Sequence, residues 1–160
     1  MPTTVNKEKL LATLADDEQI REDPFAVLQD ISLFCYMEPE SDFGTELVLR
    51  ALNFRGAFEG YHEVLNELTR QVGLFPYLDP MELDVQDQIA IEFHRAEGMV
   101  DSTVFHRTQS EIHQHLMNGE NVVLSAPTSF GKSLIVDAVI ASKKHRNIAI
   151  VVPTLSLIHI

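Results

Sequence analysis

The sequence predicts an α/β fold, in which a parallel sheet with its helices begins after an all-helical region. Apolar residues recur at helical spacing through roughly the first hundred residues. Two short, continuous apolar runs follow, at residues 121–126 and 147–153, and such runs are typical of parallel strands buried on both faces. A helical pattern at residues 131–145 separates them, so the predicted order is strand, helix, strand, a βαβ unit with a right-handed crossover.

The distribution of charge divides the chain near the same point. Residues 1–100 hold 7 Lys and Arg against 20 Asp and Glu, a balance of −13, and residues 101–160 hold 5 against 4, a balance of +1. We therefore expect an acidic helical accessory region over residues 1–98 and a second domain over residues 99–154. The acidic region should not bind nucleic acid nonspecifically, because phosphates repel it. Its charged faces are either a solvated exterior or a surface for a protein partner.

Five helices are expected in the accessory region, at residues 6–18, 21–39, 41–52, 59–73 and 80–98. Asp23 is a favourable N-cap for the second helix, and Pro24 stands at the first helical position, where proline is well tolerated. Gly73 supplies a left-handed stop for the fourth helix. Asp79 and Pro80 are expected to open the fifth helix as Asp23 and Pro24 open the second.

The single cysteine, Cys35, lies in an apolar helical pattern and is expected in the core. One cysteine cannot form an intrachain disulfide, which fits a reducing cytosol. The first residues lack the apolar run of a signal peptide, and no segment approaches the ~20 apolar residues of a membrane span. We therefore expect a soluble, cytoplasmic protein with no membrane partner.

The turn between the first predicted strand and the next helix is the candidate functional site. It consists of Ala126, Pro127, Thr128, Ser129, Phe130, Gly131, Lys132 and Ser133. Such a turn collects unpaired N–H groups at the positive end of a helix dipole and can hold phosphate. Gly131 would let the backbone approach the phosphates, Lys132 would reach the β- and γ-phosphates, and the Ser133 hydroxyl would bind Mg²⁺. The expected cofactors are ATP and Mg²⁺, and the plainer alternative is an ordinary strand-to-helix turn.

The stretch APTSFGKS, residues 126–133, resembles motif I of superfamily 2 helicases of the DEAD/DEAH-box-like group, which usually reads A-x-T-G-x-G-K-T. Ser129 stands where that family commonly has glycine, the freer residue in a loop. Ser133 replaces threonine and keeps the hydroxyl that would bind Mg²⁺.

Two further stretches match the same family. Gln109, 17 positions before Ala126, resembles the Q-motif glutamine, which in the family reads the adenine edge through a bidentate amide contact. Phe105 is either a base-packing side chain or a core aromatic, and Arg107 is either a nucleotide contact or a surface arginine. The stretch IVVPT, residues 150–154, resembles motif Ia of these helicases.

In motif Ia a Pro-Thr pair faces the nucleic-acid backbone, so the resemblance implies backbone contacts from Pro153 and Thr154 to DNA or RNA. The resemblance covers residues 105–154. It implies a RecA-like P-loop domain, hydrolysis of ATP with Lys132 in the catalytic role, and movement along nucleic acid or separation of its strands.

Motif II, whose carboxylates hold Mg²⁺ and orient water, is not found in these 160 residues. We therefore expect an N-terminal helicase fragment with motifs Q, I and Ia alone, inactive by itself because phosphoryl transfer needs those groups. The last six residues, LSLIHI, coincide with the translation of a widely used transposase sequencing adapter. Residues 155–160 are accordingly predicted to be a non-native tail.

Three functions stay open on the sequence. The favoured one is an ATP-dependent nucleic-acid helicase. The second is a superfamily 2 translocase of a restriction or defence system that moves without separating strands. The third, from another class, is an interaction module whose P-loop binds but does not hydrolyse nucleotide.

Overall fold

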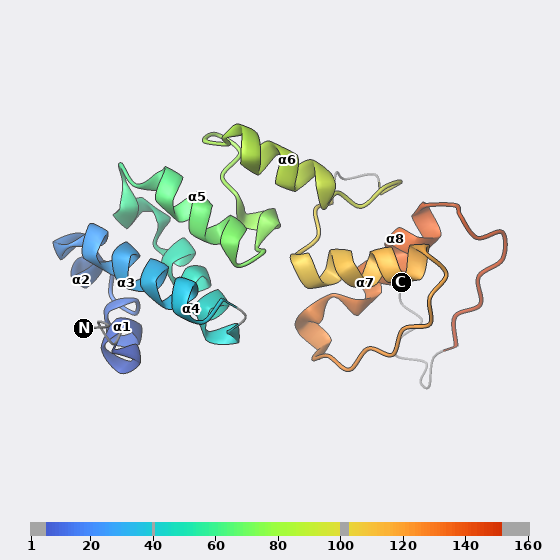
Figure 1. The fold of residues 1–160 in the computed structure, drawn as a ribbon, viewed down its shortest axis with the longest axis horizontal. Coiled ribbons are helices and arrows are strands. Elements are labelled where there is room, and N and C mark those ends of the chain that lie inside the picture. Colours follow the sequence, from blue (N-terminus) through green and yellow to red (C-terminus); the bar gives the residue numbers. More distant parts are fainter. Residues whose placement is uncertain (1–5, 40, 100–102, 152–160) are drawn as a thin grey trace. The chain divides into compact units, whose positions relative to one another are not determined.

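The computed structural model describes residues 6–39, 41–99 and 103–151, and the regular structure of these residues is helical (Figure 1). The α-helices are α1 (Lys7–Thr13), α2 (Asp17–Glu22), α3 (Pro24–Met37), α4 (Asp42–Asn53), α5 (His62–Gln71), α6 (Val85–Phe93), α7 (Arg107–Met117) and α8 (Lys132–Ala141). Short 3₁₀ turns lie between them, at η1 (Arg55–Phe58), η2 (Phe75–Tyr77) and η3 (Thr128–Phe130).

The chain divides into two compact units. The first unit runs to Arg95 and also takes in Val104–Thr108. The second unit holds Ala96–Thr103 and continues from Gln109. Helices α1 to α6 therefore belong to the first unit, and α8 and most of α7 belong to the second.

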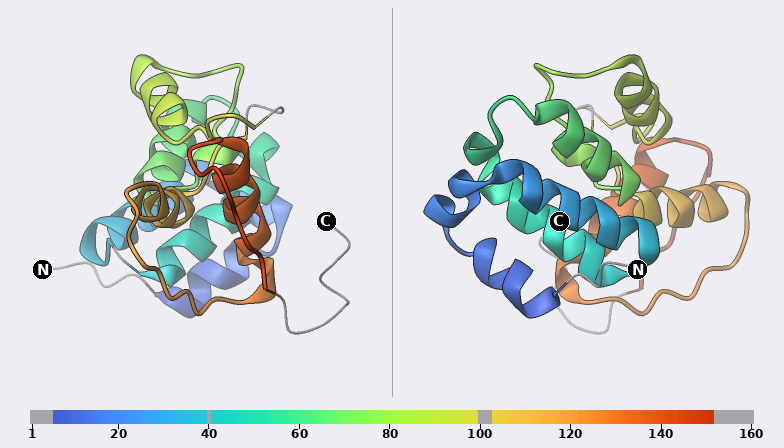
Figure 2. Two further views of the ribbon diagram at one scale, coloured as in Figure 1. Left: turned by 90° about the vertical axis from the view of Figure 1, so that its right-hand side faces the viewer. Right: turned by 60° about the vertical axis from the view of Figure 1, so that its left-hand side comes forward.

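The core of the first unit lies where α3, α4 and α5 pack against one another, as the views in Figure 2 show. Apolar side chains at helical spacing are removed from water there: Leu28, Ile31 and Phe34 in α3, Leu47, Val48 and Ala51 in α4, and Leu65 and Leu68 in α5. Each fully buried large aliphatic side chain contributes about 1.5–3 kcal/mol relative to exposure. Cys35 is also buried in this core, as predicted, and its burial raises the pKa of the thiol.

Aspartate caps set where the first helices begin. Asp16 caps α2, so the single helix predicted over residues 6–18 is in fact two helices, α1 and α2. Asp23 accepts a hydrogen bond from the Ala26 N–H at 3.0 Å, and Pro24 is the first residue of α3. The predicted start of α3 is therefore confirmed.

Helix α6 begins at Val85 and not at Pro80 as predicted. Asp84 and Asp87 form a reciprocal capping box at its start, which satisfies two of the helix's unpaired N–H groups. The buried Asp87 carboxylate lies 3.2 Å from the Arg70 guanidinium of α5. Burial raises the pKa of Asp87, and the Arg70 charge acts in the opposite direction.

The predicted α/β fold is wrong for the described residues, because neither predicted strand forms. Residues 121–126 and 147–151 follow irregular backbone, and Val123 is fully exposed. The paired extended backbone of the described residues is limited to one isolated antiparallel bridge, Arg95 with Val104. A strand is stabilised by the hydrogen bonds of its neighbours, and a sheet needs about three strands with a packed face to be stable by itself. Two apolar runs do not meet that requirement.

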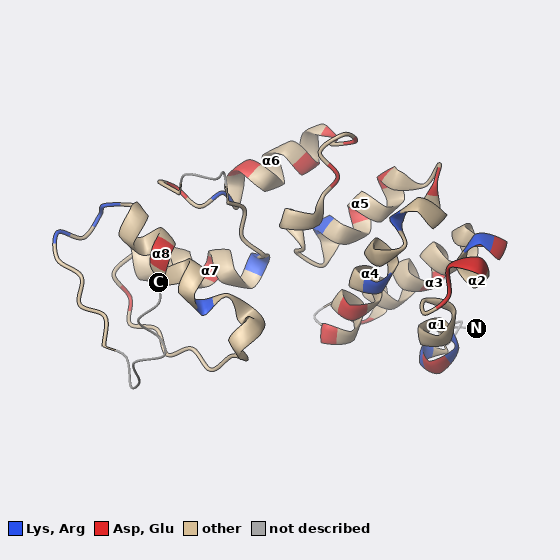
Figure 3. Ribbon diagram, turned by 180° about the vertical axis from the view of Figure 1, so that it is seen from behind, with Lys and Arg blue, Asp and Glu red and all other residues tan. Residues whose placement is uncertain are grey.

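Acidic residues are distributed along α1 to α6 with fewer basic residues among them, as Figure 3 shows. Over the described residues, no helix combines the length and the apolar composition that crossing a bilayer would require.

We predict that Val48→Ala lowers the free energy of unfolding by about 2 kcal/mol, because two buried methyl groups are lost and a cavity remains. Val48 is 0% exposed in α4, whereas Val64 in α5 is 40% exposed. Val64→Ala is the matched control and should change the value by less than about 0.5 kcal/mol. Urea unfolding of the chain measures both, and equal losses would contradict the packing described.

Candidate functional site

The turn before α8 is built around one left-handed residue. Gly131 has φ of +84° and directly follows η3, and residues with a Cβ rarely adopt this conformation. Gly131 is also the N-cap of α8, and no side chain caps this helix end. The first N–H groups of α8 therefore lack a side-chain acceptor at the positive end of the helix dipole.

Gln109 connects α7 to this turn. Its side chain is 6% exposed, and its amide Nε2 donates to the Phe130 carbonyl oxygen at 2.7 Å. A Cβ added to Gly131 would lie 2.7 Å from the same Nε2 atom, closer than non-bonded atoms tolerate. The backbone conformation thus favours glycine at position 131, and a side chain there would also move the Gln109 amide from its place.

Lys132, the first residue of α8, folds its side chain back over the turn. Its ammonium donates to the carbonyl oxygens of Ala126 and Pro127, each at 2.7 Å. Among the residues that the structure describes, no carboxylate lies within ion-pairing distance of this ammonium. Carbonyl oxygens carry only partial charges, so the positive charge of Lys132 is held in place without being neutralised.

The remaining residues of the turn lie on its outer side. Thr128, Ser129 and Ser133 are exposed, so their hydroxyls are open to a ligand or to water. An uncapped helix N-terminus, an unneutralised ammonium and a hydroxyl thus occur within three consecutive residues. This is a set of groups that suits a phosphate and an associated cation.

The other predicted site residues have different placements. Phe105 is 1% exposed in the first unit, and its N–H donates to the His94 carbonyl oxygen at 2.9 Å. It is therefore a core aromatic, the plainer of the two alternatives. Pro153 and Thr154, like the predicted tail at residues 155–160, lie outside the described residues.

Arg107 is the residue whose role the sequence did not indicate. Its side chain donates to backbone carbonyl oxygens at the C-terminal end of α5 and contacts Gly73. In the sequence Gly73 predicts only a helix stop, and its second role depends on a residue more than thirty positions away. A local pattern carries no signal for such a contact.

Two histidines near the first turns of α7 are partly buried. Burial lowers the pKa of His106, whose ring lies 5.6 Å from that of Tyr77. Burial also lowers the pKa of His113, and the nearby Glu97 charge opposes that shift. Both imidazoles therefore favour the neutral form in the folded chain.

Comparison with known proteins gives two family matches. Residues 1–88, more than half of the chain, match the anti-bacteriophage protein B N-terminal domain, and residues 106–159 match the DEAD/DEAH box helicase family. Anti-bacteriophage protein B of Escherichia coli (strain K12) is 41% identical over 118 residues, which are 72% of this chain and 16% of that protein. The chain thus spans a small part of the length of this relative. No solved structure matches.

We predict that Gly131→Ala destabilises the chain more than Gly119→Ala does. Both glycines are left-handed, with φ of +84° and +80°, and a Cβ in that region costs about 1–2 kcal/mol. A Cβ at Gly119 meets nothing within 4 Å, whereas one at Gly131 displaces the Gln109 amide. The lost hydrogen bond should add about 0.5–1.5 kcal/mol in urea unfolding. Equal costs would show that the Gln109 contact does not form.

We also predict a dependence of stability on pH through His106. Because its pKa is lowered in the folded chain, its stabilising contribution is complete above the unfolded value of about 6.5 and is lost as the pH falls through the folded value. His106→Phe should therefore flatten the fall in unfolding free energy between about pH 7 and pH 5. The same change at the exposed His145 controls for the added phenylalanine. An unchanged slope in the His106 variant would contradict the prediction.

Proposed function

The chain belongs to the family of the anti-bacteriophage protein B N-terminal domain, and on this premise we propose that it is the nucleotide-binding part of an ATP-dependent, helicase-like motor that acts in defence against bacteriophage. The coarser part of this statement, helicase-like and similar to a phage-defence protein, follows from the matches. The nucleotide, its hydrolysis and the nucleic acid are the proposal.

One observation carries the proposal: the Gln109 amide meets the turn at Gly131 within the part of the chain that matches DEAD/DEAH box helicases. A glutamine and a glycine-lysine-serine turn are each common by themselves. Their contact through a 2.7 Å hydrogen bond, 21 residues apart in sequence, is what a site for both base and phosphates requires. An ordinary turn before a helix has no need of it.

The residues present fit ATP with Mg²⁺. The uncapped N–H groups of α8 and the unneutralised Lys132 ammonium would hold phosphate oxygens. The exposed Ser133 hydroxyl would be this chain's ligand to Mg²⁺, an ion that is usually bound through substrate phosphates with few protein ligands. When bound, Mg²⁺ neutralises charge that develops on the transferred phosphoryl group.

For Lys132 to reach a phosphate, its ammonium would leave the carbonyl oxygens of Ala126 and Pro127. Those contacts to neutral carbonyl oxygens would be exchanged for contacts to phosphate oxygens, whose full negative charge attracts the ammonium more strongly. The side chain is already at the turn, so the change needs only rotation about its own bonds. Gln109 would keep the turn in shape meanwhile and present its amide to the adenine edge.

The second candidate is a translocase that moves along nucleic acid without separating strands, and the defence role named for the relative favours it. A helicase and a translocase would use the same nucleotide site, but only the helicase would produce separated strands. Either motor would contact a nucleic-acid backbone and would work in the cytoplasm, where phage nucleic acid is copied. Strand separation measured beside ATP hydrolysis, on the natural gene product that contains these residues, distinguishes them.

We predict that Lys132→Ala weakens binding of a fluorescent ATP analogue, with Mg²⁺ present, by at least about tenfold, since one charge-assisted contact is worth about 1.5–3 kcal/mol. Lys143→Ala removes the same charge from an exposed position of the same unit and should leave the affinity unchanged. Titration of the natural gene product measures both. Equal affinity of the Lys132 variant and the unmodified protein would refute the proposed site.

A further inference from the structure

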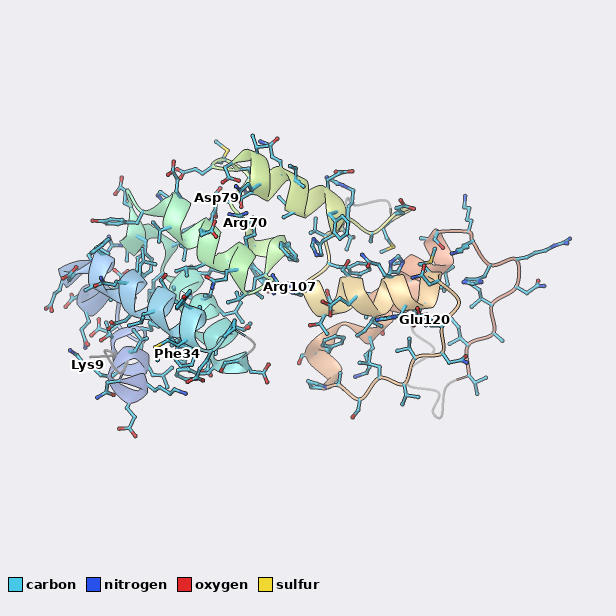
Figure 4. All side chains as sticks on the ribbon, in the orientation of Figure 1. Lys9, Phe34, Arg70, Asp79, Arg107 and Glu120 are labelled. Atoms are coloured by element: carbon cyan, nitrogen blue, oxygen red, sulfur yellow. The ribbon has the colours of Figure 1, made fainter. Side chains whose placement is uncertain are left out.

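An apolar groove lies along α3 and α5, two helices that run side by side within the first unit (Figure 4). Its volume is about 410 Å³, which is room for several side chains, and its apolar walls are Phe25, Leu28, Leu33 and Tyr36 of α3 and Val64 of α5. Phe25 is 55% exposed and Tyr36 is 80% exposed. A groove walled by exposed apolar side chains is the kind of surface at which proteins bind partners.

Helix α3 is apolar on two faces, and the described structure covers one of them. Its core face holds Ile31, Phe34 and Cys35, all buried. The groove is lined by positions 25, 29, 32, 33 and 36, which follow the spacing i, i+4, i+7, i+8 and i+11 of a single helix face. A helix that is apolar nearly all round is usually buried all round, so the groove face has the composition of a surface that is covered.

The shape of the groove suits a helix. From Phe25 to Tyr36 it follows eleven steps of α3, about 16 Å at the helical rise per residue, or about three turns. Two neighbouring helices present a groove into which the apolar side chains of a third can pack. Gln29 and Ser32 add polar groups to the lining, and such groups can fix the register of a bound helix.

An acidic hollow adjoins the groove at Val64, which lines both. Three carboxylates line this hollow, those of Glu59, Glu63 and Glu82. Within the described ranges, none of the three has an ion-pair partner within 4.0 Å. The end of the groove at Val64 is therefore bordered by negative charge that is not neutralised.

The basic side chains of the first unit are in large part already paired. Arg21 interacts with Glu59 at longer range, but its guanidinium is bonded to Asp17 at 2.7 Å. The others in ion pairs are Lys7, Arg50, Arg55, Arg70 and Arg95. Charge complementarity at the hollow therefore favours a cationic partner.

The same charge disfavours other occupants. Residues 1–100 hold 7 Lys and Arg against 20 Asp and Glu, so a second copy of the chain would bring carboxylates against carboxylates. Nucleic acid and anionic lipid surfaces carry phosphates, which these carboxylates repel. A helix that binds a membrane surface also carries Lys and Arg on its polar face.

We propose that this groove binds an amphipathic helix of a protein partner, whose apolar face packs against Phe25, Tyr36 and Val64 and whose Lys or Arg side chains enter the acidic hollow. The inference is independent of the proposed nucleotide site, because all of its residues belong to the first unit. It gives the acidic helical region the role of recruiting a basic partner.

The probe is a fluorescent peptide of about 14 residues, or about four helical turns, with leucines along one face and lysines at both ends. Fluorescence anisotropy measures its binding to the natural gene product that contains these residues. We expect saturable binding, and at least about tenfold weaker binding when glutamates replace the lysines or when the leucines are scattered around the helix. No binding, or equal binding of the three peptides, would overturn the inference.

Two exposed phenylalanines test the groove itself. Phe25→Ala removes an apolar wall and should weaken binding of the lysine peptide at least about tenfold, as loss of an aromatic anchor does. Phe93→Ala is the matched control, because Phe93 is 69% exposed in α6 and does not line the groove. Tyr36→Ala should act as Phe25→Ala does. Equal losses with Phe25→Ala and Phe93→Ala would overturn the inference.

Two exposed glutamates test the charge. Glu63 and Glu18 each lie in the first turn of a helix, α5 and α2, and Glu63 alone lines the acidic hollow. Glu63→Lys should weaken peptide binding about tenfold near 0.05 M salt and by less near 0.5 M, because salt screens exposed charges. Glu18→Lys should leave the affinity unchanged. An equal loss in both variants would contradict the inference.

Light scattering on the natural gene product tests the second-copy alternative. We expect Phe25→Ala to leave the measured mass unchanged. Self-association that is lost in Phe25→Ala would overturn the inference and assign the groove to a second copy of the chain.

Discussion

The hydrogen bond from the Gln109 amide to the Phe130 carbonyl joins α7 to the turn before α8 within the second unit. It holds the turn before α8 so close to α7 that a Cβ at position 131 would displace the amide, and the left-handed backbone at that position also favours glycine. The left-handed Gly131 then starts α8 without a side-chain cap and brings Lys132 over the turn. Hydrogen bonds thus connect the turn both to the buried Gln109 amide and to the Lys132 ammonium. The chemistry proposed for this part of the chain uses all three.

Charge is arranged to make that cation effective. The chain has a formal net charge of −12, and most of its acidic residues precede residue 100. The Lys132 ammonium is bound by neutral carbonyl oxygens and has no ion-pair partner among the described residues, so its field is available to an anion. In the helical unit, by contrast, basic side chains are engaged: Arg55 pairs with Asp79 at 2.9 Å, and Arg70 pairs with Glu67 and Asp87. An anion at the turn would therefore meet a positive charge that no described carboxylate neutralises.

The apolar runs at residues 121–126 and 147–153 have the composition of buried strands, and yet the described part of each is irregular and largely exposed. The composition of a segment indicates how much apolar surface it can bury. Strand pairing depends instead on neighbouring strands that supply hydrogen bonds and on elements that cover the face of the sheet. Helix α8 shows the contrast. Its intrahelical bonds are local, so it forms between the two runs although the described part of neither run is a strand. The match to DEAD/DEAH box helicases over residues 106–159 is thus a match of sequence, and the described part of that segment, up to residue 151, forms no sheet.

What the sequence by itself determined is local. Apolar spacing and caps located most of the helices, Asp23 and Pro24 marked the start of α3, and the glycine-lysine-serine stretch marked a turn at a helix start. The break between α1 and α2 was missed because Asp16 caps a new helix inside the predicted one, and the late start of α6 was missed because Asp84, and not Asp79, caps that helix. Tertiary structure alone decided that Arg107 binds the end of α5 and that the described parts of the apolar runs do not pair. Helical periodicity and capping act within a few residues, whereas strand pairing and the Arg107 contact join residues that are distant in the chain and near only after folding.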